Sequence, residues 1–254
     1  MAGVFFACLV AGTVTLADGS DSAALSGYHF LGPELRAMQD DAFANPGTLW
    51  LQRGAALWRE EAGAGGASCH ACHGDAGASM AGVAARYPAF DGQLGRVINL
   101  EQRIRHCRRQ HQRAPAFEWE SAELLALSLL VTRQSRGLPL APLVEGPARA
   151  SFERGRALFA RRLGQLNLSC QHCHQQSVGL RLRGEVVSQG QINGFPIYRL
   201  LWDSLASSHR MFAWCNEAVR AQPYAAGAQE YVDLELYLKW RGRGLAVEAP
   251  ALRR

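Results

Sequence analysis

The stretch Ser68-Cys69-His70-Ala71-Cys72-His73 decides the fold, and it recurs 101 residues later as Ser169-Cys170-Gln171-His172-Cys173-His174. An arginine and a glycine precede each copy at matched positions, Arg53-Gly54 and Arg154-Gly155. Cys-x-x-Cys-His is the attachment signature of c-type haem. Its two thiols bond to the haem vinyl groups, and the adjacent histidine turns its imidazole toward the iron. The sequence therefore predicts two covalently bound haem c groups. The predicted attachment residues are Cys69, Cys72, Cys170 and Cys173, and the predicted proximal iron ligands are His73 and His174.

Two other uses of paired cysteines fit the sequence less well. A four-cysteine zinc site places its Cys-x-x-Cys pairs about 15–20 residues apart, whereas nearly a hundred residues separate Cys72 from Cys170. A thioredoxin-like redox pair lies in a βαβ setting, and the sequence shows no such pattern. A histidine directly after both pairs, at matched places of a repeat, favours haem.

The repeat extends beyond the two motifs. Cys107 and Cys215 each lie eight residues before a proline. The offset between the copies grows from 101 to about 107 residues at Glu123 and its counterpart Glu230, which places an insertion in the second copy near 184–195. We therefore predict a mainly α protein of two tandem cytochrome c-like domains related by internal duplication.

Prolines and glycines mark the boundary between the two domains. They interrupt helical periodicity over 137–147. The first domain, with haem 1, is predicted over 24–138, and the second domain, with haem 2, over 148–254. Apolar residues at three- and four-residue spacing predict one helix within 121–135 and another within 228–241. A short pair of strands is predicted within 178–187.

The N-terminal residues 1–17 predict a signal peptide. An apolar run over 4–16 is followed by small residues at the positions that precede a cleavage point. No lysine or arginine precedes the run, but the run is shorter than the ~20 residues that a membrane-spanning helix needs. Because haem attachment through Cys-x-x-Cys-His also points to export, we predict a periplasmic protein. Cys8 would be removed with the signal.

The composition is that of an ordinary globular protein. The 254 residues are 48% hydrophobic and 19% charged, which excludes disorder, collagen and coiled coil for the whole chain. The formal net charge is +5, and twenty-six arginines stand against a single lysine, Lys239. Mild basicity suggests an anionic substrate or an acidic partner. No basic cluster is interleaved with stacking aromatic residues, so nucleic acid is not a predicted partner.

The sixth ligand of each iron can be sought by matching the two copies. Met38 precedes the first motif, Met80 lies only seven residues beyond its histidine, and Met211 is available to the second copy alone. His209 is matched by Glu101 in the first copy. None of these residues serves both copies.

Cys107 and Cys215 do match each other. We therefore predict histidine/cysteine ligation of both irons, with these two thiolates as the sixth ligands. The alternatives are a pair of small buried side chains or a Cys107–Cys215 disulfide between the repeats. Thiolate ligation would stabilise Fe(III) and lower the reduction potential.

At this level of detail the chain resembles the SoxA family, the subunits of SoxAX cytochromes that begin periplasmic thiosulfate oxidation. The resemblance runs from about Gly32 to the C-terminus. Besides the two haem motifs, its specific parts are Leu100-Glu101-Gln102-Arg103-Ile104, Glu123-Leu124-Leu125-Ala126-Leu127, Arg133-Gln134-Ser135-Arg136-Gly137, Val219-Arg220-Ala221 and Glu235-Leu236-Tyr237-Leu238-Lys239-Trp240-Arg241. Since both haem motifs are intact, the resemblance implies the dihaem type.

The resemblance also implies roles for the two lone cysteines. Cys107 would ligate the first iron and Cys215 the second, and Cys215 would carry the activity, because the family bears a persulfide there. The family reaction, that of an L-cysteine S-thiosulfotransferase, joins thiosulfate oxidatively to a cysteine of the carrier SoxYZ. Two electrons pass toward the haem of the partner subunit SoxX. The alternative is a non-catalytic dihaem electron-transfer cytochrome in which Cys215 is only a ligand. A peroxidase-like dihaem enzyme would need an open iron site, which two matched cysteine ligands argue against.

The residue that binds the anionic substrate is less clearly marked. The family places an arginine about one helical turn before the active cysteine, where this chain has Met211. The neighbouring Arg210 is therefore the first candidate for the sulfonate group, with Arg220 and Arg241 as alternatives. The basic run 103–109 around Cys107 is predicted to be a haem-propionate clamp or a solvated face. The first haem is expected to be structural or an electron reservoir.

Overall fold

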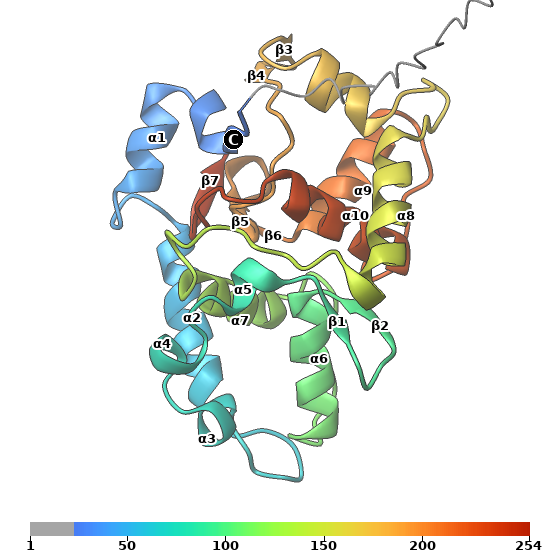
Figure 1. Ribbon diagram of the computed structural model, residues 1–254. Coiled ribbons are helices and arrows are strands. Elements are labelled where there is room, and N and C mark those ends of the chain that lie inside the picture. The colour runs from blue at the N-terminus through green and yellow to red at the C-terminus, as the bar shows by residue number, and fades with distance from the viewer. Residues whose placement is uncertain (1–22) are drawn as a thin grey trace, which may run out of the picture.

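The computed structural model in Figure 1 describes residues 23–254, so the predicted signal peptide and Cys8 lie outside the described residues. The described chain is mainly helical, with short strands between the helices. The α-helices are α1 (Pro33–Asp40), α2 (Gly47–Arg59), α3 (Cys69–His73), α4 (Ala76–Ser79), α5 (Val83–Arg86), α6 (Leu100–Gln110), α7 (Ala122–Arg133), α8 (Arg149–Ala160), α9 (Ser208–Ala218) and α10 (Gln229–Arg241). The shorter helical turns are η1 (Gly27–Phe30), η2 (Gly146–Ala148), η3 (His172–Gln176) and η4 (Leu200–Trp202). The strands are β1 (Ala89–Asp91), β2 (Arg96–Ile98), β3 (Arg181–Leu182), β4 (Glu185–Val186), β5 (Ile197–Arg199), β6 (Ser204–Ala206) and β7 (Ala251–Arg253).

The first half is built on the packing of α2 against α7. Ser121 starts α7 by accepting a hydrogen bond from the backbone N–H of Leu124 at 3.3 Å. Gly54 allows the two helices to approach closely, because a Cβ at this position would lie 2.4 Å from the carbonyl oxygen of Ala126. Apolar side chains from α2 and from α4 to α7 close the core beside this contact. They are Trp58, Ala76, Ala84, Leu100, Leu127, Leu130 and Val131.

The second half has the same kind of contact between α8 and α10. A Cβ on Gly155 would lie 1.9 Å from the carbonyl oxygen of Asp233. Aromatic rings fill the space along the two helices, with the Phe159 and Tyr237 ring centroids 5.4 Å apart. The absence of a side chain at Gly155 therefore sets the distance between α8 and α10.

A three-stranded sheet in the second half contains the C-terminal strand of the chain. Its order is β6-β5-β7, with β6 antiparallel and β7 parallel to β5. Helix α1 lies beside β7 (Figure 1), and Gln39 accepts a hydrogen bond from the backbone N–H of Leu252 at 2.9 Å. Asn45 donates to the carbonyl oxygen of Pro250 at 3.0 Å. The segment before α2 therefore packs on the C-terminal strand.

The stretch between the two halves is extended and hydrogen-bonded. The N–H of Gly137 donates to Val247 at 3.0 Å, and the N–H of Leu140 donates to Leu245 at 2.9 Å. No helix runs through 137–145, as the prolines and glycines predicted. The helices predicted within 121–135 and 228–241 are confirmed as α7 and α10, and the predicted strand pair is confirmed as β3 and β4.

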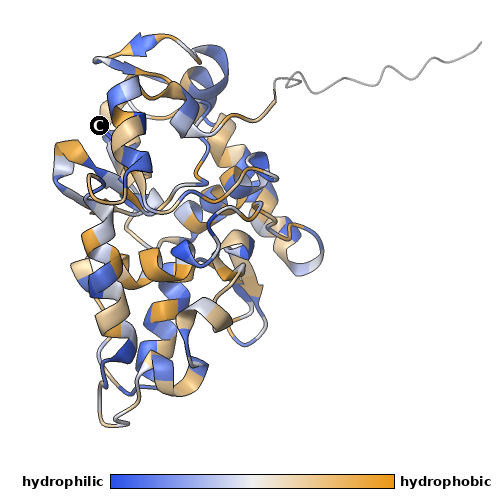
Figure 2. Cartoon of the chain, turned by 90° about the vertical axis from the view of Figure 1, so that its left-hand side faces the viewer, coloured by the Kyte–Doolittle hydropathy of each residue, from blue (hydrophilic) through white to orange (hydrophobic). Residues whose placement is uncertain are grey.

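Both hydrophobic and hydrophilic residues occur along the helices (Figure 2). Over residues 23–254, none of the helices has both the length and the apolar character needed to cross a membrane. The buried apolar side chains belong to internal clusters instead, such as the one around Tyr231 between α8, α9 and α10.

Candidate functional site

The first Cys-x-x-Cys-His motif forms the short helix α3. Ser68 starts this helix by accepting a hydrogen bond from the N–H of Ala71 at 3.0 Å. His73 ends the helix with an exposed side chain, and its ring centroid lies 5.8 Å from that of Trp58 on α2. The Trp58 indole N–H donates to the carbonyl oxygen of Gly74 at 2.9 Å. The buried indole therefore fixes the end of the motif to the first core.

The second motif leads into the turn η3 and holds its histidine more firmly. Nδ1 of His174 lies 2.8 Å from the carbonyl oxygen of Ser188, so this nitrogen carries the proton and Nε2 is left as the ligand atom. Burial lowers the pKa of His174, which favours the neutral imidazole that metals bind. A Cβ on Gly190 would lie 2.8 Å from Cγ of the ring. The bare backbone at Gly190 therefore forms one wall of the histidine's position.

Each lone cysteine lies beside its own motif. Cys107 on α6 acts electrostatically on Cys69, and Cys72 acts on Cys107. Burial raises the pKa of Cys69 and of Cys107. Cys215 on α9 has both cysteines of the second motif as neighbours in the same way. None of the six cysteines within residues 23–254 forms a disulfide, so the alternative of a Cys107–Cys215 disulfide is wrong.

The protonation state of Cys215 depends on its burial and on whether its sulfur binds a metal ion. Burial raises the pKa of this thiol to about 12, and the second motif's thiols add to the rise while Arg199 opposes it. Such a thiol is protonated at neutral pH, whereas the thiolate is the nucleophile and the ligand. Coordination to a metal ion removes the proton. A neutral imidazole and a buried sulfur next to a Cys-x-x-Cys pair are therefore a donor set that fits haem c.

Arg199, at the end of β5, is a site residue that the sequence patterns missed. Its side chain is buried (3% exposed), and its guanidinium lies 4.8 Å from the Trp202 ring centroid and 4.6 Å from that of Trp214. Nη1 donates to Sδ of Met211 at 3.6 Å. Since Trp214 and Met211 lie one and four residues before Cys215 on α9, the guanidinium lies next to the helical turn that carries this cysteine.

The remaining partners of Arg199 leave part of its charge available. Nη2 lies 3.3 Å from Oε1 of Glu185, a carboxylate that is 41% exposed. Nε is buried, and no acceptor for it occurs among residues 23–254. A buried N–H without an acceptor costs folding free energy. A bound anion would supply the missing acceptor.

Arg210 contacts the same tryptophan group. Its guanidinium is 4.3 Å from the Trp202 ring centroid, and its Nη1 donates to Oγ of Ser204 at 3.2 Å. Trp202 thus contacts two cations, one from β5 and one from α9. The structure brings the predicted Arg210 toward the same group of side chains as Arg199.

Comparison with known proteins places this arrangement in a family. The family model described as "SoxA/TsdA, cytochrome c domain" matches residues 53–140. L-cysteine S-thiosulfotransferase subunit SoxA of Pseudaminobacter salicylatoxidans is 40% identical over 90% of this chain and 80% of its own length. The subunit of the same name from Rhodovulum sulfidophilum is 38% identical over 94% of this chain and 83% of its own length. The crystal structure of SoxXA from P. pantotrophus matches with a TM-score of 0.88 at 34% identity, covering 91% of this chain and 87% of that one. The chain belongs to the SoxA family.

The other two candidate arginines of this SoxA-family chain have different surroundings. Arg220 is exposed and has a left-handed backbone conformation after α9. Arg241 donates to the carbonyl oxygen of Gln189 at 3.2 Å and acts electrostatically on Cys170 and His174. Arg241 therefore lies on the side of the second motif, whereas Arg199 acts on Cys215.

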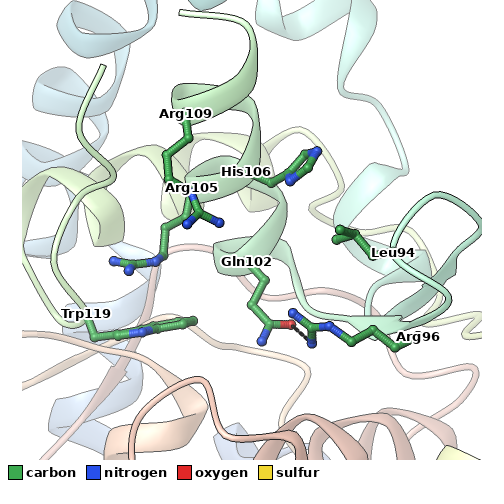
Figure 3. A pocket seen from close by; sticks show the side chains of 7 residues that line it. All are labelled: Leu94, Arg96, Gln102, Arg105, His106, Arg109 and Trp119. Carbon is green, nitrogen blue, oxygen red and sulfur yellow. Dashed lines mark hydrogen bonds between the residues drawn. The ribbon is translucent and has the colours of Figure 1, made fainter. Parts of the chain in front are cut away.

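The basic run on α6 splits into two faces in this SoxA-family chain. Arg103 pairs with the buried carboxylate of Asp91 and acts on Cys107. Arg105 and Arg109 instead line a cavity of about 200 Å³ (Figure 3). The prediction of one propionate clamp or one solvated face for the whole run is therefore too simple.

A buried polar cluster lies where the two halves meet. Nε2 of His209 on α9 lies 3.2 Å from Oε2 of Glu235 on α10, and Nδ2 of Asn99 donates to the same oxygen at 3.0 Å. Glu101 on α6 and Lys239 on α10 act on this cluster electrostatically. His209 thus has its partners at the junction between the two halves.

Substituting glutamine for Glu101 is expected to remove part of the pH dependence of stability. Burial, followed by repulsion from Glu235, raises the pKa of Glu101 to about 7 from the ordinary 4.5. The stability that this group contributes is therefore complete below about pH 4.5 and is lost as the pH rises through about 7, by up to about 3 kcal/mol. Thermal unfolding from pH 5 to pH 8 should show a smaller decline for Glu101→Gln than for the wild type. Glu118→Gln, at an exposed site, is the control, and equal declines in the wild type and Glu101→Gln would contradict the expectation.

Proposed function

We propose that this chain is a periplasmic dihaem c-type cytochrome that joins thiosulfate oxidatively to a cysteine of the carrier SoxYZ. The relatives at 40% and 38% identity are named as subunits of an L-cysteine S-thiosulfotransferase, which supports this activity. The observation that carries the proposal is Cys215 beside the second Cys-x-x-Cys-His motif, with the buried Arg199 next to it. The similar structure is titled SoxXA, which supports SoxX as the partner subunit and as the receiver of the electrons.

Two haem c groups are proposed, one in each of the units 24–138 and 148–254. The first would be attached through Cys69 and Cys72 and ligated by His73 and Cys107. The second would be attached through Cys170 and Cys173 and ligated by His174 and Cys215. When bound, the haem groups supply a metal ion that keeps the Cys107 and Cys215 thiols deprotonated. They also supply an acceptor for the electrons of the reaction.

Internal duplication is supported by matched contacts in the two halves. A Cβ on Gly63 would lie 2.2 Å from the carbonyl oxygen of Gln112, just after α6. A Cβ on Gly164, 101 residues later, would lie 2.2 Å from the carbonyl oxygen of Val219, just after α9. The helix contacts at Gly54 and Gly155 correspond in the same way. Each lone cysteine helix thus packs on the loop that precedes its own motif.

The proposed reaction balances in two steps. The Cys215 thiolate forms an S–S bond with the sulfane sulfur of thiosulfate, giving Cys215–S–S–SO₃⁻ and two electrons. The carrier thiolate then attacks that sulfane sulfur and displaces the Cys215 thiolate, which leaves R–S–S–SO₃⁻ on the carrier. The sum is R–SH + S₂O₃²⁻ → R–S–S–SO₃⁻ + H⁺ + 2 e⁻. Cys215 serves first as nucleophile and then as leaving group.

Two arginines are proposed to bind the sulfonate end of thiosulfate. Arg210 has one Nη1 contact to a neutral hydroxyl, and Arg199 has a buried Nε without an acceptor. A guanidinium matches the oxygens of a sulfonate in geometry and charge. Held against Trp202 and Trp214, Arg199 would orient the substrate so that its sulfane sulfur faces Cys215.

Arg199→Gln is expected to raise the KM for thiosulfate by about 10- to 100-fold, the loss of one charge-assisted hydrogen bond of roughly 1.5–3 kcal/mol. Arg210→Gln is expected to have a smaller effect because its side chain is not buried. Arg156→Gln, at an exposed position on α8, is the matched control. Steady-state kinetics with the carrier as second substrate gives KM and kcat separately, and melting temperatures show whether each variant is folded. An unchanged KM in a folded Arg199→Gln variant would remove Arg199 from the substrate site.

The cofactor part of the proposal has its own measurement. Intact-mass analysis of the mature protein is expected to show two covalent haem groups and, in a fraction of molecules, one added sulfur atom on Cys215. Electron paramagnetic resonance of the oxidised protein should give low-spin thiolate signals from both haems. The Cys107→Ala and Cys215→Ala variants should each lose one of the two signals. A histidine/methionine spectrum would contradict the proposed ligands.

A further inference from the structure

A cavity of about 200 Å³ lies on the face of α6 that points away from Cys107. Positions 102, 105, 106 and 109 recur at three- and four-residue spacing, so they share one face of the helix. Cys107 is two positions from both Arg105 and Arg109, which places it on the opposite side. Figure 3 shows the lining side chains converging from α6, from the β1–β2 hairpin and from the segment after α6. The polar and aromatic members of the lining are Arg96, Gln102, Arg105, His106, Arg109 and Trp119.

The charge of this cavity is positive and unbalanced. Three guanidinium groups line it, and none of the lining side chains is acidic. The acidic group that acts on Arg105 is Glu118, whose side chain is exposed, while Arg109 acts against Arg105 as a like charge. Because arginine stays protonated, the cavity keeps these charges at any physiological pH.

Trp119 forms a fixed floor beneath Arg105. The Trp119 ring stacks on His209 with centroids 6.2 Å apart and an interplanar angle of 20°. A Cβ on Gly227 would lie 2.0 Å from the indole, so the backbone of the second half holds the ring in place. The Arg105 guanidinium lies 4.7 Å from the Trp119 ring centroid. Nη1 of Arg105 is buried and has no hydrogen-bond partner within residues 23–254.

Arg96 is also positioned before any ligand arrives. Its Nη1 donates to Oε1 of Gln229 at 3.0 Å and makes a longer contact of 3.5 Å with Oε1 of Gln102. Both acceptors are neutral, so neither cancels the charge. Because the guanidinium groups of Arg96 and Arg105 are already held in place, less conformational entropy is lost when an anion binds. The orphaned Nη1 of Arg105 gives that anion a donor that nothing else in the described chain satisfies.

We propose that this cavity binds a small tetrahedral oxyanion. A pair of guanidinium forks suits the oxygens of sulfate, thiosulfate or phosphate. The volume is below the roughly 300–1,000 Å³ of pockets that take larger organic ligands, which favours an inorganic anion over a nucleotide. The site is separate from the proposed reaction at Cys215, because its lining contains no residue of β5 or α9 and none of the proposed haem ligands.

Isothermal titration of the haem-loaded protein with sodium sulfate, thiosulfate and phosphate, at constant ionic strength in a chloride buffer, tests this proposal. Saturable binding of at least one anion to the wild type is expected. Arg105→Gln should weaken it at least about tenfold, and Arg105→Lys should weaken it less because the charge is retained. Arg181→Gln, at an exposed position on β3, should leave it unchanged. Sulfate lacks the sulfane sulfur that reacts with Cys215, so its binding reports on this cavity alone. Binding of phosphate shows whether the cavity accepts phosphorus oxyanions as well as sulfur oxyanions.

The location of the anion is tested by crystals of the same protein soaked in selenate, with data collected at the selenium edge. A peak within hydrogen-bonding distance of Arg105, lost in Arg105→Gln, would support the proposal. Binding at crystal concentration only, with no solution binding of any of the three anions, would overturn it. So would solution binding that survives in Arg105→Gln. If sulfate no longer binds once the co-purified partner cytochrome is added, the cavity is covered by that partner, and a free-anion site is again refuted. Activity with thiosulfate and the carrier is measured in parallel, so failure of this site and failure of the proposed function are distinguished.

Discussion

Replacing Cys215 with alanine is expected to abolish the thiosulfate-dependent modification of the carrier. A loss on the order of 10³-fold or more in kcat is expected, as for removal of other enzymic nucleophiles. The assay is mass spectrometry of the carrier after incubation with thiosulfate and an oxidised cytochrome partner. Addition of one S–S–SO₃⁻ group to the carrier cysteine is the product to be counted.

The size of this effect follows from the surroundings of the sulfur. Burial alone would hold the Cys215 thiol protonated, with a pKa of about 12. In the proposed site, a haem iron and the neighbouring Arg199 would together make this thiolate available. Water or another side chain cannot replace a sulfur that must act as both nucleophile and leaving group.

Cys107→Ala is the matched control, because this cysteine holds the corresponding place on α6 beside the first motif. It is expected to lose the thiolate signal of the first haem while keeping most of the activity. Visible spectra of both variants check that both haems remain attached. If Cys215→Ala still modified the carrier, the chain would have to be read as a non-catalytic dihaem electron-transfer cytochrome, with Cys215 as a ligand only.

The predicted attachment residues depend on local sequence alone. Two thiols and a histidine within five consecutive residues have relative positions that the local backbone sets, so the attachment motifs can be predicted without knowledge of the tertiary structure. The matching of the copies led to the prediction of Cys107 and Cys215, because a duplicated unit that binds the same group would repeat its ligands at the same place. The structure sets each of them beside its own motif.

The same comparison explains His209 and Glu101, which occupy matched positions and meet in one buried cluster at the junction. Positions that correspond in two copies can face each other where the copies join. Two different residues at such matched positions indicate an interface between the copies, whereas identical residues indicate a repeated ligand. The sequence showed the mismatch, and the hydrogen bond from Asn99, at the start of α6, to Glu235 on α10 gives its physical reason.

Arg199 and the position of α1 could not be predicted, since both depend on long-range pairing. Arg199 comes near Cys215 only because β5 lies between β6 and β7, and no periodicity in the sequence specifies that order. Helix α1 lies in the predicted first domain, but it packs on β7 near the other end of the chain. An arginine at the end of the apolar pair Ile197-Tyr198 was the one local signal, and alone it does not distinguish a buried cation from a strand end.

Gly155→Ala is expected to destabilise the protein by about 2 kcal/mol or more, the opposite of what helix propensity predicts. In the interior of an exposed helix, glycine to alanine stabilises by roughly 0.5–1 kcal/mol. On α8, however, the added carbon would lie 1.9 Å from the carbonyl oxygen of Asp233, and backbone atoms on α10 cannot rotate away. The helices must separate, which loosens the contact between Phe159 and Tyr237 and the ion pair of Arg154 with Asp233.

Thermal unfolding of the haem-loaded protein, followed by far-ultraviolet circular dichroism, measures whether Gly155→Ala lowers or raises the stability. Gly54→Ala in the first half should be destabilising too, but less so, because its added carbon would be 2.4 Å from the nearest backbone oxygen. Ala157→Gly, at an exposed position on α8, isolates propensity and should cost only about 1 kcal/mol. A neutral or stabilising Gly155→Ala would mean that α8 and α10 are not in close contact in the folded protein. The loop to the second motif begins where α8 ends, so the placement of Cys170 and Cys173 relative to Cys215 depends on that contact.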